Sequence, residues 1–168
     1  MSWSRRKGRN KPSSHSERTS RNSRRRKTVH KNPSPEEIRN LLESSRTIAV
    51  VGLSENPRRP SHEVSKAMKT FGYEIFPVNP NLSSPVLGKN PHSSLREVTA
   101  PVDIVDVFRK SEEAMPIARE AVEIGAKALW LQLGVINEEA AEYASSRGLT
   151  VVMNRCIKVD YARFTPGF

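Results

Sequence analysis

Short apolar runs alternate with amphipathic segments along the chain from residue 34 onward. The runs that we expect to form strands are Thr47–Val51, Glu74–Val78, Val102–Phe108, Ala126–Leu131 and Leu149–Met153. Because these runs are almost continuously apolar, each strand should be covered on both faces. Alternating strands and helices favour parallel pairing with right-handed crossovers. The pattern therefore predicts an α/β fold, a single Rossmann-like, doubly wound and mainly parallel sheet with helices on both faces.

Helix-start signals separate most of these runs. Ser34, Pro35 and Glu37 form the pattern of a capping box, with proline at the first helical position. Further helices are expected to begin near Pro60 and after Asn137. Pro116 leaves two readings open, because it either begins its helix or kinks one that starts at residue 111. Residues 154–168 have no clear assignment.

Positive charge is concentrated at the N-terminus. Residues 1–33 contain 12 Lys and Arg and one acid, whereas residues 34–168 contain 16 Lys and Arg and 17 acids. The formal net charge of +10 is therefore a property of the first segment and is no evidence that the folded part binds nucleic acid. Residues 1–33 also contain few apolar side chains, so we predict a disordered basic tail there and a folded domain at 34–168.

The basic tail (residues 1–33) leaves three interpretations open. It is a solvated extension, an arm that binds nucleic acid or another anionic polymer, or an organelle transit peptide. The last of these is the weakest match, because the segment lacks the apolar face of an amphipathic presequence.

Composition narrows the remaining classes of function. Cys156 is the single cysteine, which excludes an internal disulfide and a zinc site made of several thiolates. No apolar run is long enough to cross a membrane, and the N-terminal region has no apolar signal-peptide core. We expect a cytoplasmic protein without a membrane partner and without a bound metal. Homo-oligomer formation stays open.

The stretch from Thr47 to Ser61 predicts a phosphate-binding turn. A β-branched run ends at Gly52, a polar loop follows, and a helix begins near Pro60. A glycine permits a close turn, and the start of a helix offers unpaired N–H groups to a phosphate. Arg58 and Arg59 add two permanent cations beside it. We interpret this stretch as a site for a phosphorylated, nucleotide-like ligand.

The dinucleotide fingerprint is incomplete in this chain. Ser54 and Pro57 follow Gly52 where that pattern has further glycines, and Asn79 follows the second strand where NAD sites usually have an acid. A neutral side chain does not repel a ribose phosphate, and nearby cations attract one. These departures favour coenzyme A or NADP over NAD, and they do not separate the first two.

Several ordered motifs resemble one protein family. The matching stretches are Ile48–Ser54, Arg59–Ser61, Gly72–Pro80, Leu87–Gly88, Val102–Arg109, Lys127–Gln132 and Val151–Cys156. Together they resemble the small single-domain CoA-binding proteins, a family similar to the CoA-binding domain of the succinyl-CoA synthetase α-subunit. The resemblance implies a protein that binds coenzyme A or an acyl-CoA as a carrier, sensor or regulatory module, without evident catalytic residues. The phosphohistidine of the synthetase has no counterpart, so ligase activity is not implied.

The same resemblance implies a role for each end of the strands. Around the pyrophosphate it places Gly52, Ser54, Arg58, Arg59, Pro60 and Ser61. It places Asn79 and Pro80 beside the adenosine. It places Phe108 and Arg109 along the middle of the ligand. Beside the pantetheine arm it places Trp130, Gln132 and Gly134. Asn154 is a departure, because the family more often has Asp there.

Other residues and functions keep alternative readings. Trp130 is also expected in the core, and Asp103 and Asp106 are expected to bind loop backbone or face solvent. Cys156 is either a free, partly buried thiol or a thiolate, favoured by Arg155, that forms a mixed disulfide with CoA. An enzyme that uses NADP or acyl-CoA, and a nucleic-acid-associated protein acting through the tail, remain the alternative functions.

Overall fold

The five strands lie side by side in the order β2–β1–β3–β4–β5, and every pairing is parallel. The computed structural model describes residues 29–165. The strands are β1 (Thr47–Val51), β2 (Glu74–Val78), β3 (Ile104–Val107), β4 (Ala128–Leu131) and β5 (Thr150–Met153). After β1 the chain adds β2 on one side of β1. It then returns to add β3 on the other side of β1, and β4 and β5 follow outward from β3. The point where the strand order reverses therefore lies between β1 and β3, where open α/β sheets bind ligands.

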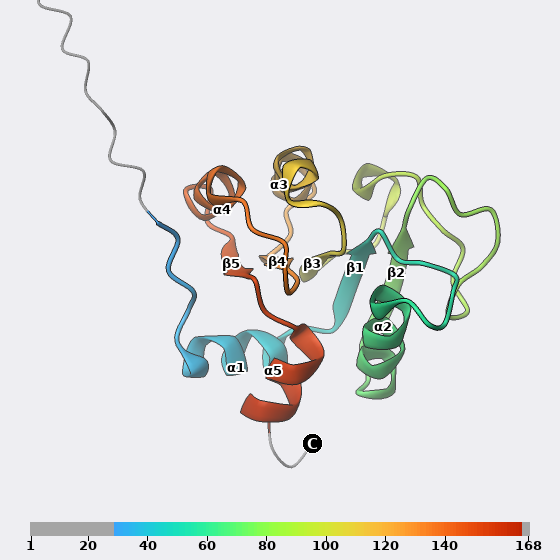
Figure 1. Cartoon of the computed structure of the whole chain (residues 1–168), viewed down its shortest axis with the longest axis horizontal. Helices are drawn as coiled ribbons and strands as arrows, with labels where there is room; N and C mark the ends of the chain where they lie inside the picture. Colours follow the sequence, from blue (N-terminus) through green and yellow to red (C-terminus); the bar gives the residue numbers. More distant parts are fainter. Residues whose placement is uncertain (1–28, 166–168) are drawn as a thin grey trace, which may run out of the picture.

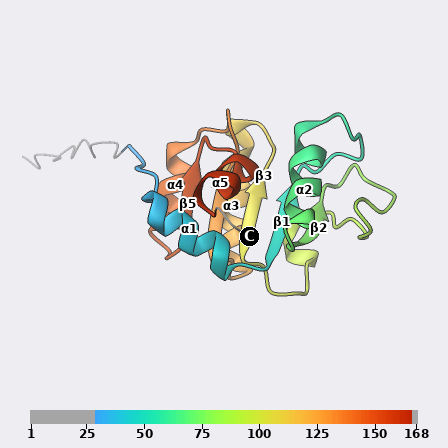
Figure 2. The same cartoon turned by 90° about the horizontal axis from the view of Figure 1, so that it is seen from below.

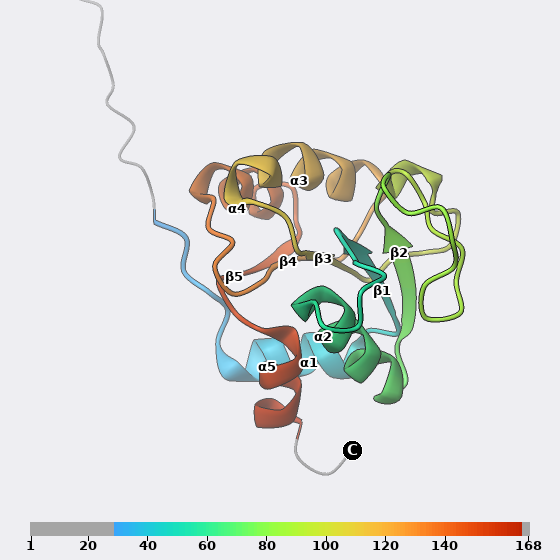
Figure 3. The ribbon, with the colours of Figure 1, turned by 45° about the vertical axis from the view of Figure 1, so that its right-hand side comes forward.

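Helices cover both faces of this sheet (Figures 1 and 3). They are α1 (Pro35–Ser44), α2 (Pro60–Thr70), α3 (Ala114–Glu123), α4 (Glu138–Ser145) and α5 (Ile157–Phe164), with short 3-10 turns η1 (Leu95–Glu97) and η2 (Ser111–Glu113). The helices α3 and α4 lie on one face, and α1, α2 and α5 lie on the other, where Figure 2 shows them in front of the strands. The predicted doubly wound, parallel α/β fold is confirmed.

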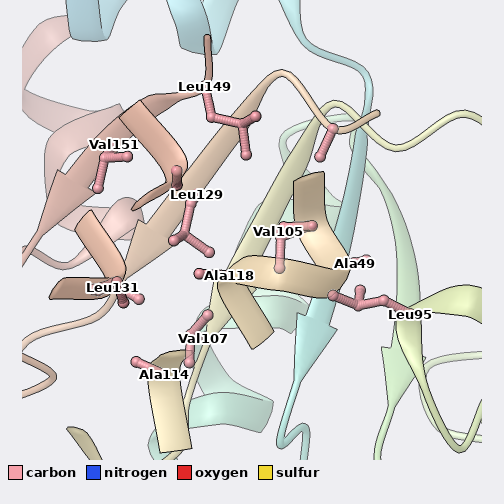
Figure 4. Packing of buried hydrophobic residues seen from close by; sticks show 14 of the residues in the cluster. Ala49, Leu95, Val105, Val107, Ala114, Ala118, Leu129, Leu131, Leu149 and Val151 are labelled. Atoms are coloured by element: carbon pink, nitrogen blue, oxygen red, sulfur yellow. The ribbon is translucent and has the colours of Figure 1, made fainter. Parts of the chain in front are cut away.

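A hydrophobic layer on each face of the sheet joins the strands to the helices that cover that face. On the α3 and α4 side, side chains such as Val105, Val107 and Leu129 pack against the small residues Ala114 and Ala118 of α3 (Figure 4). Alternate residues of the same strands point to the other face, where α1, α2 and α5 cover them. Successive side chains of a strand point to opposite faces, which explains why the strands are apolar throughout.

The helix starts follow the local signals closely. Ser34 and Glu37 form the predicted capping box of α1, and the side chain of Asn137 caps α4. Pro116 lies in the first turn of α3, where its missing N–H breaks no helical hydrogen bond. The segment without an assignment in the sequence contains α5, which packs against α1 and α2.

The edge of β5 is covered by residues that precede α1. The side-chain amide of Asn32 donates to the carbonyl oxygen of Met153 at 2.9 Å and accepts from its N–H at 2.8 Å. The ring Nε2 of His30 donates to the carbonyl oxygen of Val151 at 2.9 Å. The folded part of the chain therefore begins before Ser34, and residues 29–33 belong to it. The rest of the predicted tail lies outside the described residues.

Within residues 29–165, no helix is both long enough and apolar enough to span a membrane.

The contacts of Asn32 predict a measurable contribution to stability. Asn32→Ala removes both hydrogen bonds to Met153 and should lower the free energy of unfolding by about 1–2 kcal/mol. Urea denaturation measures this change. Asn40→Ala is the matched control, because Asn40 is exposed on α1 and its side chain forms no hydrogen bond to any of residues 29–165. Equal stability of the two variants would show that the segment before α1 does not support the edge of the sheet.

Candidate functional site

Gly52 brings the loops after β1 and β3 into contact. Its φ is +88°, in the region that favours glycine, and its N–H donates to the carbonyl oxygen of Val78 at 2.8 Å. A Cβ atom at this position would lie 2.5 Å from the carbonyl oxygen of Phe108 and 2.7 Å from Cδ of Arg109. The predicted need for a glycine at this turn is confirmed, because both the backbone conformation and the close approach exclude a side chain.

The loop between β1 and α2 is fixed by its own polar groups. The N–H of Ser54 donates to Oγ of Ser61 at 3.0 Å, and Oγ of Ser54 accepts from the N–H of Asn56 at 3.1 Å. The ring Nδ1 of His62 donates to the carbonyl oxygen of Ser54 at 2.9 Å. The hydroxyl hydrogen of Ser61 remains available for a ligand, because its oxygen serves as the acceptor for Ser54.

The start of α2 is positively polarised and basic. Arg59 occupies the N-cap position without a side-chain capping bond, and Pro60, the first helical residue, has no N–H. Neither Arg58 nor Arg59 forms an ion pair with any residue in the described part of the chain. A helix N-terminus with an adjacent guanidinium favours an anion.

A main cleft of about 630 Å³ runs from this helix start to the loop after β4. Its lining includes Gly52, Ser54, Arg59, Pro60, Ser61, Phe108 and Gln132 from the predicted set. The cleft also includes Val64, Leu133 and Val135, which the sequence did not predict as ligand contacts, and Cys156, which one of its two readings placed beside CoA. Nothing in the spacing of Val64, Leu133 and Val135 along the chain marks a ligand contact.

A second cleft, of about 340 Å³, also includes Gly52 in its lining. Three further predicted residues, Asn79, Pro80 and Arg109, line it. The side-chain amide of Asn79 donates to the carbonyl oxygen of Leu53 at 3.1 Å, so it ties the end of β2 to the loop after β1. Arg109 is paired with Glu113 at 2.8 Å. The predicted site is thus divided between two clefts that share Gly52.

Three predicted residues line neither cleft. Arg58 is exposed beside the main cleft. Trp130 is fully buried in the core, as expected for its strand, and its Nε1 donates to the carbonyl oxygen of Arg155 at 2.8 Å. Gly134 donates its N–H to Oδ1 of Asn154 at 2.8 Å, and Asn154 itself has a left-handed φ of 58°. Asn154 therefore shapes the loop after β4, a task that needs no carboxylate.

Asp106 was expected to bind loop backbone or face solvent, and this prediction is wrong for it. Its side chain is 1% exposed, and its Oδ1 accepts from Nε2 of Gln132 at 2.6 Å. Burial raises the pKa of Asp106 to about 7, and the hydrogen bonds from Gln132 and from the N–H of Val107 oppose this rise only in part. For Asp103 the prediction is confirmed, because its carboxylate accepts from the N–H groups of Arg46 and Thr47.

Cys156 lines the main cleft at the start of α5, and Arg155, which one of the two readings of Cys156 placed beside its thiolate, has other partners. The guanidinium of Arg155 forms two hydrogen bonds to the carboxylate of Asp160, at 2.6 and 2.7 Å. It also lies 5.8 Å from the ring centroid of Phe164. The positive charge of Arg155 is therefore paired with a carboxylate rather than left free for a thiolate.

Comparisons with known proteins agree with this architecture. Residues 46–162 match the model of the CoA binding domain family. The uncharacterised protein YneT of Bacillus subtilis (strain 168) is 50% identical over 131 residues, which are 78% of this chain and 96% of that protein.

Two solved structures have a similar fold. A hypothetical protein from Pyrococcus horikoshii OT3 superposes with a TM-score of 0.76 at 32% identity, over 82% of this chain and 99% of its own. The cell-free ID.343 protein from Thermus thermophilus superposes with a TM-score of 0.76 at 33% identity, over 79% and 99% of the two chains.

The buried carboxyl group of Asp106 predicts a pH-dependent stability. Between about pH 4 and pH 7 the folded chain holds a proton on Asp106 that the unfolded chain releases. This stabilising contribution is complete below about pH 4 and is lost as the pH rises through about 7. Asp106→Asn cannot titrate, so its free energy of unfolding relative to the parent should rise from about pH 5 to about pH 8. Urea denaturation at both pH values tests this, and a difference that does not change with pH would contradict it.

Proposed function

Because the chain belongs to the CoA-binding domain family, we propose that it binds coenzyme A in the two clefts that share Gly52. The observation that carries the proposal is the meeting of three features at one end of the main cleft. These features are the close turn at Gly52, the start of α2 with the hydroxyl of Ser61, and the guanidinium of Arg59, which has no ion-pair partner in the described part of the chain.

The pyrophosphate of CoA lies at this point in the proposed complex. It needs hydrogen-bond donors and positive charge, which the hydroxyl of Ser61, the first N–H of α2 and Arg59 supply. Gly52 permits the turn after β1 to lie directly against the loop after β3, which sets the position of the start of α2 at this end of the cleft. Arg58 lies outside the cleft and contributes mainly through its charge.

The other parts of CoA follow from this placement. The second cleft, beside Asn79 and Pro80, takes the adenosine. The main cleft takes the pantetheine arm, whose thiol end then reaches Leu133, Val135 and Cys156. The exposed side chain of Leu133 offers apolar surface at the place where an acyl group begins, which favours an acyl-CoA as well as free CoA.

The proposed role is that of a carrier, sensor or regulatory module. The main cleft is basic at Arg59, polar at Ser54, Ser61 and Gln132, and otherwise mostly apolar. Few polar groups in an apolar cleft are typical of a site that holds and orients a ligand.

Loss of Arg59 tests the placement of the pyrophosphate. Arg59→Ala removes one charged hydrogen bond and should weaken CoA binding by about tenfold or more, which corresponds to roughly 1.5–3 kcal/mol. Isothermal titration calorimetry measures the affinity. The matched control is Arg58→Ala, which removes an equal charge outside the cleft lining and should have a smaller effect. Equal affinities of both variants and the parent would mean that the pyrophosphate lies elsewhere.

A second function is proposed for the basic segment. Of the 12 Lys and Arg in residues 1–33, all but Lys31 lie in residues 1–28, a charge density that suits an anionic polymer. The expected result is binding of single-stranded RNA that weakens steeply as salt increases and disappears when residues 1–28 are deleted. This truncation keeps His30 and Asn32 on β5. Filter binding across a salt series measures the effect, and RNA retained by the truncated chain would contradict the assignment.

A further inference from the structure

Asp106 and Gln132 form a buried polar pair at the edge of the main cleft. Asp106 is 1% exposed and Gln132 is 3% exposed, and 2.6 Å separates Oδ1 of Asp106 from Nε2 of Gln132. Gln132 lines the cleft, whereas Asp106 lies behind it on β3. Burying a carboxyl group in an apolar layer costs free energy of folding. Its position behind a ligand cleft therefore indicates a functional role.

The hydrogen bond between these residues fixes which atom of Gln132 faces a ligand. An ionised carboxylate only accepts hydrogen bonds, so the glutamine must turn its NH₂ group toward Asp106. Its carbonyl Oε1 then points away from Asp106 and has no hydrogen-bond partner among residues 29–165. Oε1 is also not among the fully buried unpaired atoms, so it retains access to the cleft that Gln132 lines.

We propose that Gln132 is a specificity-determining residue whose Oε1 accepts a hydrogen bond from an N–H donor of the ligand, and that Asp106 is the positioning residue that holds the amide in this orientation. The inference rests on the proposed function, in which the pantetheine arm occupies the main cleft. That arm contains amide N–H groups. The adenosine and pyrophosphate part of CoA binds at the other end and has no need of Gln132.

Protonation of Asp106 weakens this orientation. Burial raises the pKa of Asp106 to about 7, so the carboxyl group changes its charge near neutral pH. A protonated carboxyl group donates its own O–H, and the amide of Gln132 can then turn its NH₂ group toward the cleft. When Asp106 is protonated in this way, the NH₂ group of Gln132 faces the amide N–H of the pantetheine arm, and two donors cannot form a hydrogen bond. Affinity for the pantetheine arm should therefore fall as the pH decreases through about 7.

The surroundings of Asp106 are otherwise apolar on the flanking strands. Its register partners are Val50 on β1 and Trp130 on β4. The helices over this face carry the following titratable or charged residues: Glu36, Glu37, Arg39 and Glu43 of α1, His62, Glu63, Lys66 and Lys69 of α2, Arg155 and Cys156 before α5, and Lys158, Asp160, Tyr161 and Arg163 of α5. Asp160 is paired with Arg155, and Glu63 with Lys158. None of these groups contributes to the raised pKa of Asp106, which is due to burial.

The test compares two ligands by calorimetry, at about pH 8 and about pH 6. One is CoA, and the other is adenosine 3′-phosphate 5′-diphosphate, which lacks the pantetheine arm. The terminal phosphate of the fragment titrates in this pH range, whereas in CoA it is esterified, so the affinity ratio of Asp106→Asn at each pH serves as the baseline. Relative to that baseline, the ratio of the parent should fall several-fold at the lower pH. Gln132→Met should lower CoA affinity by about fivefold and leave the fragment unchanged. Asp106→Asn should lower the ratio at about pH 8 and should keep only the pH dependence that comes from the terminal phosphate of the fragment.

The control and the contrary outcomes separate this inference from the proposed function. Asp103→Asn removes a carboxylate at the opposite end of β3 and should keep the parent's pH dependence. If both cleft variants keep the parent's ratio at each pH, or lose both ligands equally, the specificity role is overturned while CoA binding by the parent stands. If the folded parent binds neither ligand, the proposed function fails, and this inference fails with it.

Discussion

The close approach of two loops at Gly52 is the constraint on which the rest of the site depends. No Cβ atom fits between the turn after β1 and the carbonyl oxygen of Phe108, which would lie only 2.5 Å away. Because the strand order reverses between β1 and β3, this contact lies at the position where a parallel sheet leaves room for a ligand. The start of α2 and the loop after β4 are placed around it, and both clefts open from it. A small backbone contact therefore determines where the proposed phosphate site lies.

Much of the fold could be predicted from local patterns in the sequence. Continuous apolar strands, the capping box at Ser34 and the capping residue Asn137 each act over a few residues, and each has the expected role. The edge of β5 was not predictable in this way. Asn32 and His30 bind strand residues about 120 positions later, and a polar segment rich in basic residues contains no sign of that pairing.

The sequence brought together most of the residues at the strand ends that line the two clefts, but it did not reveal the side-chain pairs behind them. Gly52, Ser61 and Arg59 follow directly from a strand, a turn and a helix start, so sequence order was enough to bring them together. Asp106 was misplaced because its strand pattern does not reveal that a neighbouring strand supplies Gln132 as its partner. The reading in which Arg155 favours a thiolate of Cys156 did not include Asp160, which lies five residues later in the first turn of α5 and pairs with the guanidinium. In both cases a pairing between side chains changed the role of a charged residue.

The central claim is that the two clefts are built for coenzyme A. Its most direct test is calorimetric titration of the full chain with CoA, NADP and NAD in parallel. The account predicts preferential binding of CoA, because the turn after Gly52 lacks the further glycines of a dinucleotide site and Asn79 replaces the usual ribose-binding acid. Preferential binding of NADP or NAD, or no binding of CoA by folded protein, would contradict it.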